Sequence, residues 1–188
     1  EGKFKHNWNK FGTWSIKKRD DGMVANINAV APAIGNIGYK EICSDIYNFE
    51  LKFKIKEWGN PNFSSLRLST NVIGNKEYRI KYSHNDKKIN LIKLKENGKQ
   101  TVKSVNQTIY LDKWYQIRLK VIEGVIQVYF NQDKIMSWKD PSPLNKGDLK
   151  LVFGSLKADI EYIEFSSFNL SNRKSFETKI SFLIGGDN

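Results

Sequence analysis

The feature that most constrains the fold is the turn at Glu123-Gly124, which lies between two alternating segments in residues 114–138. Glycine at the second position of a two-residue turn supplies the positive φ that a tight hairpin needs. Folding the chain here places apolar residues opposite apolar ones and polar opposite polar, an arrangement that a one-residue slip would destroy. The predicted pairs are Val121 with Ile126, Leu119 with Val128, Ile117 with Phe130, Lys120 with Gln127 and Arg118 with Tyr129. Residues 131–133 predict a second turn, and the resulting meander needs another sheet to cover its apolar face.

The rest of the chain repeats this alternation in short stretches separated by turn-forming residues. We predict strands at 23–27, 49–55, 66–68, 78–82, 89–94, 108–111, 149–153 and 159–165. Residues 30–39, which contain glycine and proline, predict a loop. No longer stretch carries apolar residues at helical spacing, so we predict an all-β fold, an antiparallel two-sheet β-sandwich of jelly-roll type.

The length of 188 residues suits one domain with a sizeable core. We assign residues 1–170 to the sandwich. Residues 171–188 alternate between apolar and polar before a Gly-Gly-Asp-Asn end, which predicts either one more strand or the start of a linker. Because the chain opens on Glu1 rather than methionine, we expect it to be part of a larger multidomain protein.

The formal net charge is +11, and it comes mainly from lysines spread along the chain. Lys52, Lys54 and Lys56 alternate with apolar residues, as on a solvated outer sheet face. A nucleic-acid-binding protein usually gathers arginines and aromatic residues into one patch, so we expect no nucleic-acid partner.

The cysteine and histidine content excludes two classes of site. Cys43 is the only cysteine, which rules out a disulfide framework and a paired-cysteine metal site. His6 and His84 are far apart, and no zinc-binding spacing surrounds either. No apolar run is long enough to span a membrane.

Several segments, taken in order, resemble a known family. Residues 12–26 (GTWSIKKRDDGMVAN) are similar to its opening "G-x-W … D-G" segment, and residues 114–131 (WYQIRLKVIEGVIQVYFN) resemble its central hairpin. Further similar stretches are 42–56 (ICSDIYNFELKFKIK), 64–69 (SSLRLS) and 75–82 (NKEYRIKY). Residues 8–170 therefore resemble the concanavalin A-like lectin/glucanase sandwiches, most closely levan-binding carbohydrate-binding modules and 3-keto-disaccharide hydrolase-like domains.

The resemblance implies a sugar-binding role for Arg67, because related modules place an arginine here that grips the sugar. A guanidinium donates two parallel hydrogen bonds to adjacent hydroxyls or to a carboxylate. The resemblance also implies that acids near Glu41 and Asp140 hold a terminal sugar, although Pro141 and Pro143 depart from the family pattern. From the residues alone, an exposed or ion-paired arginine and ordinary loop acids remain alternatives.

Aromatic side chains are candidates for the other half of sugar recognition, since the C–H face of a sugar packs on a flat ring. Trp58 lies in a loop with glycine, asparagine and proline, and Trp138 ends a strand beside Asp140. Tyr78 lies across from the strand of Arg67. For both tryptophans, core packing and ligand contact stay open.

An enzymatic alternative rests on Asp159, Glu161 and Glu164. Glucanases of this fold use E-x-D-x-x-E, with carboxylates on both sides of the scissile bond, whereas this chain has D-x-E-x-x-E in a late strand. Such acids are also compatible with a structural calcium, which the spacing does not specify. We expect no required cofactor.

We conclude from the sequence that this is a secreted or cell-surface, non-catalytic carbohydrate-binding module that recognises a polysaccharide or a terminal sugar. Its predicted ligand-binding residues are Arg67, Glu41, Asp140, Trp58, Tyr78 and Trp138. The alternatives are a glycoside hydrolase, and a structural or adhesion module that binds anionic polymers.

Overall fold

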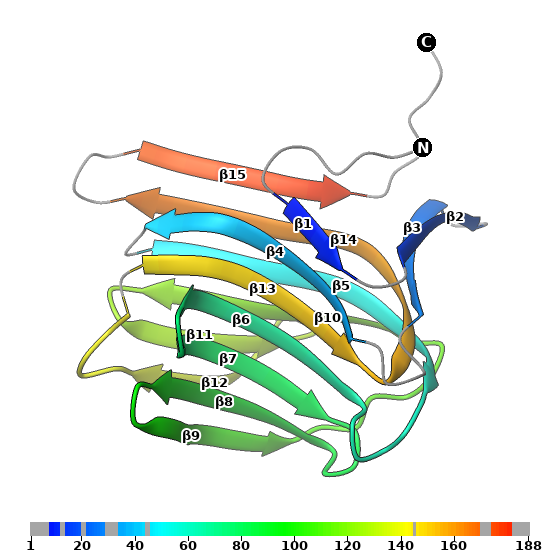
Figure 1. Cartoon of the computed structure of the whole chain (residues 1–188), viewed down its shortest axis with the longest axis horizontal. Helices are drawn as coiled ribbons and strands as arrows, with labels where there is room; N and C mark the ends of the chain where they lie inside the picture. The colour runs from blue at the N-terminus through cyan, green and yellow to red at the C-terminus, as the bar shows by residue number, and fades with distance from the viewer. Residues whose placement is uncertain are drawn as a thin grey trace.

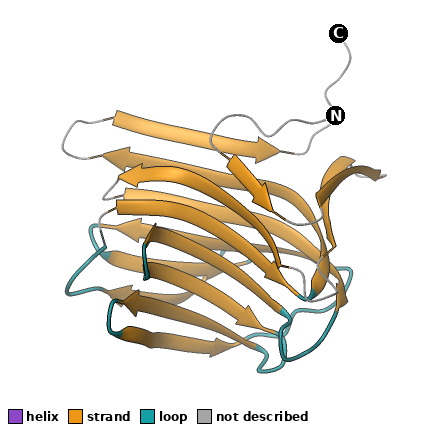
Figure 2. Cartoon of the chain, viewed as in Figure 1, coloured by secondary structure: helices purple, strands orange, loops and turns teal. Residues whose placement is uncertain are grey.

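The structure is a computed structural model, and it describes residues 8–11, 14–19, 22–28, 34–43, 46–144, 146–169 and 174–181. Side chains are described for residues 27–28, 46–144 and 147–168. Within these ranges every regular element is a β-strand, and turns and loops join the strands (Figure 2). The predicted all-β class is confirmed.

The strands form two antiparallel sheets that lie one over the other (Figure 1). Sheet A has seven strands, in the spatial order β1 (Trp8–Phe11), β4 (Ile34–Cys43), β13 (Lys146–Gly154), β6 (Ser65–Ile73), β7 (Lys76–Ser83), β8 (Lys88–Lys95) and β9 (Gly98–Asn106). Sheet B has eight strands, in the order β12 (Asp133–Lys139), β11 (Val125–Phe130), β10 (Trp114–Ile122), β5 (Ile46–Trp58), β14 (Leu156–Asn169), β3 (Gly22–Asn28) and β2 (Trp14–Arg19), with β15 (Lys174–Ser181) also paired to β14. The stretch after residue 170 thus contains a strand of sheet B.

The hairpin of β10 and β11 has the predicted register. Val121 pairs with Ile126, Leu119 with Val128 and Ile117 with Phe130. Glu123 and Gly124 in the turn have φ values of 46° and 77°, the left-handed conformation that a two-residue hairpin turn requires. The sequence pattern therefore specified this part of the fold through local geometry and cross-strand pairing.

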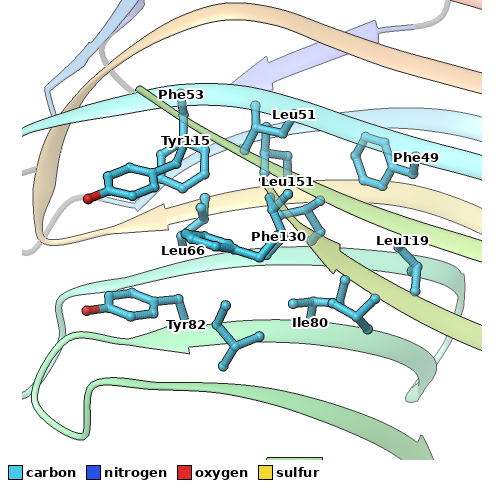
Figure 3. Close-up of a cluster of buried hydrophobic side chains, with 14 of the residues drawn as sticks. Phe49, Leu51, Phe53, Leu66, Ile80, Tyr82, Tyr115, Leu119, Phe130 and Leu151 are labelled. Carbon is cyan, nitrogen blue, oxygen red and sulfur yellow. The ribbon is translucent and has the colours of Figure 1, made fainter. Parts of the chain in front are cut away.

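The core lies between the sheets and is built from the inward-facing residues of each strand (Figure 3). In β5 the alternation is clear, because Phe49, Leu51, Phe53 and Ile55 have no exposed surface. Sheet A contributes Leu66, Ile80, Tyr82 and Leu151 from the opposite side, among others. Burying one such side chain contributes about 1.5–3 kcal/mol, which is why the two sheets hold together without disulfides.

The structure corrects two predictions made from the sequence. Most of the predicted loop at 30–39 falls in β4, which pairs with β1 on one side and β13 on the other. These two neighbours supply backbone hydrogen bonds that outweigh the weak strand preference of its glycines. Residues 108–111 are a loop, not a strand, and Ile109 still reaches the core from it. The strand at this edge is β9, whose mostly exposed residues lack the alternation that would have predicted it.

Gly147 in β13 allows an unusually close approach between two strands, and its replacement tests the packing there. Its φ is +131°, and an added Cβ would lie 2.4 Å from the carbonyl carbon of Asn71. We expect Gly147→Ala to lower the free energy of unfolding by about 2–4 kcal/mol in urea denaturation, through backbone strain and steric overlap together. Gly98→Ala is the matched control, because Gly98 has a φ of +124° but no atom within 4 Å of the added Cβ. Equal losses in the two variants would show that the close approach contributes nothing.

Candidate functional site

Arg67 lies on the outer face of sheet A, at the centre of the sheet. Its neighbours in sequence, Leu66 and Leu68, are buried in the core, so the pleat turns Arg67 to the other side. In register it lies between Val152 of β13 and Lys81 of β7. The side chain is half-buried, which confirms the predicted orientation away from the core.

Two further cations share this face, and we call Arg67, Arg79 and Lys81 the basic cluster. Arg79 pairs in register with Ser69, which is the next outward-facing pair of β6 and β7 after Arg67 and Lys81. Arg79 also forms an ion pair with Glu77. No acidic side chain of the described residues forms an ion pair with Arg67 or Lys81. Like charges directly opposite each other in a sheet are destabilising, so this arrangement costs stability.

The electrostatics of the basic cluster reflect burial and crowding. Burial lowers the pKa of the Arg67 guanidinium, repulsion from Arg79 lowers it further, and Glu77 acts in the opposite direction. Burial also lowers the pKa of Lys81, with added repulsion from Arg67, Lys99 and Arg79. An anionic or oxygen-rich partner at the basic cluster would favour the charged form of both side chains.

Some polar atoms of this face have no partner among the described residues. They are the Nε atoms of Arg67 and Arg79 and the Oγ of Ser69. Ser69 is fully buried although its place in the strand turns it to the outer face. These three atoms are buried, so a ligand would instead meet the partly exposed side chains of Arg67 and Lys81, whose charged groups donate hydrogen bonds to hydroxyl or carboxylate oxygens.

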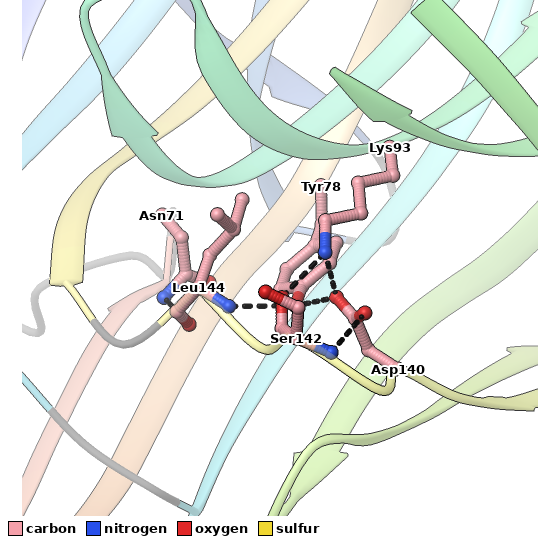
Figure 4. Close-up of polar contacts among 6 residues, drawn as sticks. All are labelled: Asn71, Tyr78, Lys93, Asp140, Ser142 and Leu144. Carbon is pink, nitrogen blue, oxygen red and sulfur yellow. Dashed lines mark hydrogen bonds and ion pairs between the residues drawn. The ribbon is translucent and has the colours of Figure 1, made fainter. Parts of the chain in front are cut away.

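Asp140 and Tyr78, two of the predicted ligand-binding residues, lie together in the interior (Figure 4). The Tyr78 hydroxyl donates to Asp140 Oδ2, and the Lys93 ammonium donates to the same oxygen at 2.5 Å. The Ser142 backbone N–H donates to Asp140 Oδ1 at 2.9 Å. Burial, followed by the hydrogen bond to Asp140, raises the pKa of Tyr78. Both carboxylate oxygens are thus occupied, and this geometry favours a structural role for Asp140 over contact with a sugar.

Trp138 packs beside this buried group. Its ring meets that of Tyr78 edge to face, with centroids 6.5 Å apart, and the Lys93 ammonium lies 5.9 Å from the Trp138 ring centroid. The structure therefore brings Tyr78, Trp138 and Asp140 together. Tyr78 comes from sheet A and Trp138 from sheet B, so these residues lie between the two sheets, whereas Arg67 is on the outer side of sheet A.

Trp58 lies at another place, where β5 ends. Its ring stacks on His84 at a centroid distance of 4.3 Å and tilts against Tyr82 at 5.6 Å. Burial lowers the pKa of His84, and Lys87 lowers it further. Trp58 is half-buried and packs against the core, so it closes this end of the sandwich. Glu41 is in β4, and its side chain is outside the part that the structure describes.

The carboxylates of the enzymatic alternative lie along β14 in sheet B. Asp159 is fully buried, with Lys54 Nζ at 4.0 Å, and Glu161 pairs with Lys52 at 2.8 Å. Glu164 is in register with Glu50 of β5. These acids are on the other sheet from the basic cluster, and the described ion pairs already engage two of them.

Arg79 and Lys81 were not among the candidate residues predicted from the sequence, although they lie beside Arg67 on the sheet. The signal was present, since Tyr78, Ile80 and Tyr82 alternate with Arg79 and Lys81 in the segment YRIKY. That alternation puts both cations on the outer face. Only the strand order of sheet A shows that β7 lies directly beside the strand of Arg67.

No family model matches the chain, and no curated protein matches it in sequence. Solved structures match it in shape. A carbohydrate-binding module of the CBM66 type from Bacillus subtilis superposes with a TM-score of 0.61 and 14% identity, over 82% of this chain and 91% of that one. A GH16 protein of Bacteroides ovatus, in complex with a mixed-linkage glucan product, has a TM-score of 0.67 and 10% identity, over 86% of this chain and 96% of that one. Sheep galectin-11, in complex with glycerol, has a TM-score of 0.54 and 14% identity, over 73% of this chain and 99% of that one.

These similarities establish the fold as a concanavalin A-like lectin/glucanase sandwich, as the sequence resemblance predicted. The matched structures include a carbohydrate-binding module, a galectin, a GH16 protein and a β-glucanase, so the fold by itself does not assign a function. Among the described residues, no helix could span a membrane, and no three histidine, cysteine or acidic side chains gather as metal ligands.

Proposed function

We propose that this chain is a non-catalytic carbohydrate-binding module and that its ligand site is the outer face of sheet A around Arg67. The observation that carries the proposal is the state of Arg67, a half-buried guanidinium at the centre of a sheet without an ion-pair partner among the described residues. An arginine kept in this state costs stability, and binding to sugar hydroxyls would explain why it is there. We expect the module to act outside the cell or at its surface.

A second candidate ligand, an acidic polysaccharide, is favoured by the basic cluster as a whole. Arg79 and Lys81 add charge next to Arg67, and the net charge of the chain is +11. Such a surface attracts anionic polymers over a distance that salt shortens to about 10 Å at 0.1 M.

A glycan screen at two salt concentrations tests the proposed function and separates the two ligand classes. We expect retention on at least one polysaccharide in affinity electrophoresis or on a glycan array. Binding to a neutral glycan should change little between 50 mM and 500 mM salt, whereas binding to an acidic glycan should fall steeply. Incubation with the retained glycan should release no reducing sugar. Turnover that Glu161→Gln removes would contradict the non-catalytic proposal, and lack of retention on any glycan would contradict the binding function.

A further inference from the structure

The outer face of sheet B contains a hollow that is separate from the basic cluster. It has a volume of about 410 Å³ and lies over β5, β10 and β14. Its lining includes Ile46, Asn48, Arg118, Lys120, Ser166 and Phe168. A hollow of this size is large enough for a single sugar unit.

The strand register explains how the hollow combines an apolar side with a polar one. Lys120, Asn48 and Ser166 form one row across β10, β5 and β14. In the next row Phe168 pairs with Ile46 at the end of the sheet. A ligand here would meet donors and acceptors along one edge and a partly exposed ring along the other.

Lys120 differs from the other lysines of this face, most of which already have a partner. Lys52 pairs with Glu161 at 2.8 Å, and Lys54 lies 4.5 Å from the ring centroid of Trp114. Lys157 pairs with Glu57 at 2.5 Å. Lys120 forms no ion pair or ring contact with any residue that the structure describes. Its ammonium is therefore available to an anion in the hollow.

Arg118 is held in place beside Lys120 and remains partly exposed. Its guanidinium stacks on the ring of Tyr129 at 4.2 Å, and its Nη1 atom lies 3.8 Å from Glu50 Oε2. The Nε atom and the amide oxygen of Asn48 are buried without a partner among the described residues, but the Arg118 side chain as a whole is 32% exposed, so the end of the guanidinium is what a ligand would meet. The Oε1 atom of Glu50 accepts hydrogen bonds from Gln116 and Tyr162, whereas Arg118 lies near the other oxygen, Oε2.

We propose that this hollow is a second binding site, for a sugar unit that carries a carboxylate. The Lys120 ammonium and the Arg118 guanidinium bind the carboxylate, which forms stronger hydrogen bonds with cations than a hydroxyl does. Ser166 and Asn48 bind hydroxyl groups, and the ring of Phe168 packs against the C–H face of the sugar. The site goes beyond the proposed function, because it lies on the other sheet and shares no residue with the basic cluster.

Titration of the ¹⁵N-labelled full chain with glucuronic acid, followed by NMR, tests this proposal. Amide signals of Lys120, Ser166 and Phe168 should shift and saturate, and Lys120→Gln should weaken this binding by about tenfold or more. Lys95→Gln is the matched control, because it removes the same charge from an exposed position at the end of β8. It should leave the titration unchanged.

The remaining outcomes are informative about each claim separately. Equal shifts with glucose would overturn the carboxylate requirement, and equal shifts with sodium acetate would overturn the sugar requirement. An unchanged titration in Lys120→Gln, or shifts confined to the basic cluster, would overturn this site and leave the proposed function standing. Saturable shifts at the hollow with no retention in the glycan screen would support this site and contradict the proposed function of the basic cluster.

Discussion

Replacing Arg67 with alanine is expected to lower the affinity for the recognised glycan by about 30- to 150-fold, which corresponds to about 2–3 kcal/mol. The reason is the loss of a two-pronged hydrogen-bond donor at the centre of sheet A, where Arg67 lies between Val152 and Lys81. The measurement is isothermal titration calorimetry with the glycan that the screen identifies. Arg67→Lys should recover only part of the affinity, because an ammonium keeps the charge but not the paired geometry.

The same substitution should not destabilise the protein. Arg67 lies beside Lys81 and is repelled by Arg79, so its removal relieves repulsion without breaking a described ion pair. We expect the urea midpoint of Arg67→Ala to be equal to or higher than that of the unchanged protein. A clear loss of stability would identify Arg67 as a structural residue, and unchanged affinity would place the sugar site elsewhere.

The largest loss of stability is expected from breaking the buried pair of Lys93 and Asp140. Their side chains are 3% and 1% exposed, and removing either partner leaves an uncompensated charge in the core. We expect Lys93→Met and Asp140→Ala each to lower the free energy of unfolding by about 3–5 kcal/mol. The effect should be measurable by urea denaturation.

Two observations make this result specific. The pair belongs to a chain of hydrogen bonds in which Tyr78 accepts from the Leu144 N–H at 2.8 Å, and Asn71 donates to the Leu144 carbonyl at 2.9 Å. Because Tyr47 of β5 donates to Asn71, the chain connects the two sheets. Removing both partners leaves no unpaired charge in the core. The double variant Lys93→Met/Asp140→Ala should therefore lose less free energy of unfolding than the sum of the two single losses.

Asp140→Asn at low temperature separates this structural role from the sugar contact implied by the sequence resemblance. It keeps the shape of the side chain but removes its charge. We expect lower stability with unchanged glycan affinity in the fraction that remains folded. Full stability combined with lost binding would restore Asp140 to the ligand site.

Much of the fold could be predicted because its information is local. The hairpin register follows from Gly124 and from matched pairs such as Leu119 with Val128, and the structure has the same register. The orientation of Arg67 follows from buried leucines on both sides of it. By contrast, β9 has almost no buried residues, and β4 contains glycines at positions where strands usually have larger side chains. Both strands depend on hydrogen bonds with neighbours that are distant in sequence.

The sequence by itself determined the two-sheet class, the central hairpin and the face on which Arg67 lies, since alternation along a strand decides which side chains face inward. Only the tertiary structure decided which residues meet. It placed Asp140 beside Lys93, 47 positions away in the chain, and Arg79 and Lys81 beside Arg67. Strand order and loop return are collective properties of the packed sheets, so no local pattern could reveal that one candidate acid is buried and that two unremarked cations surround the candidate arginine.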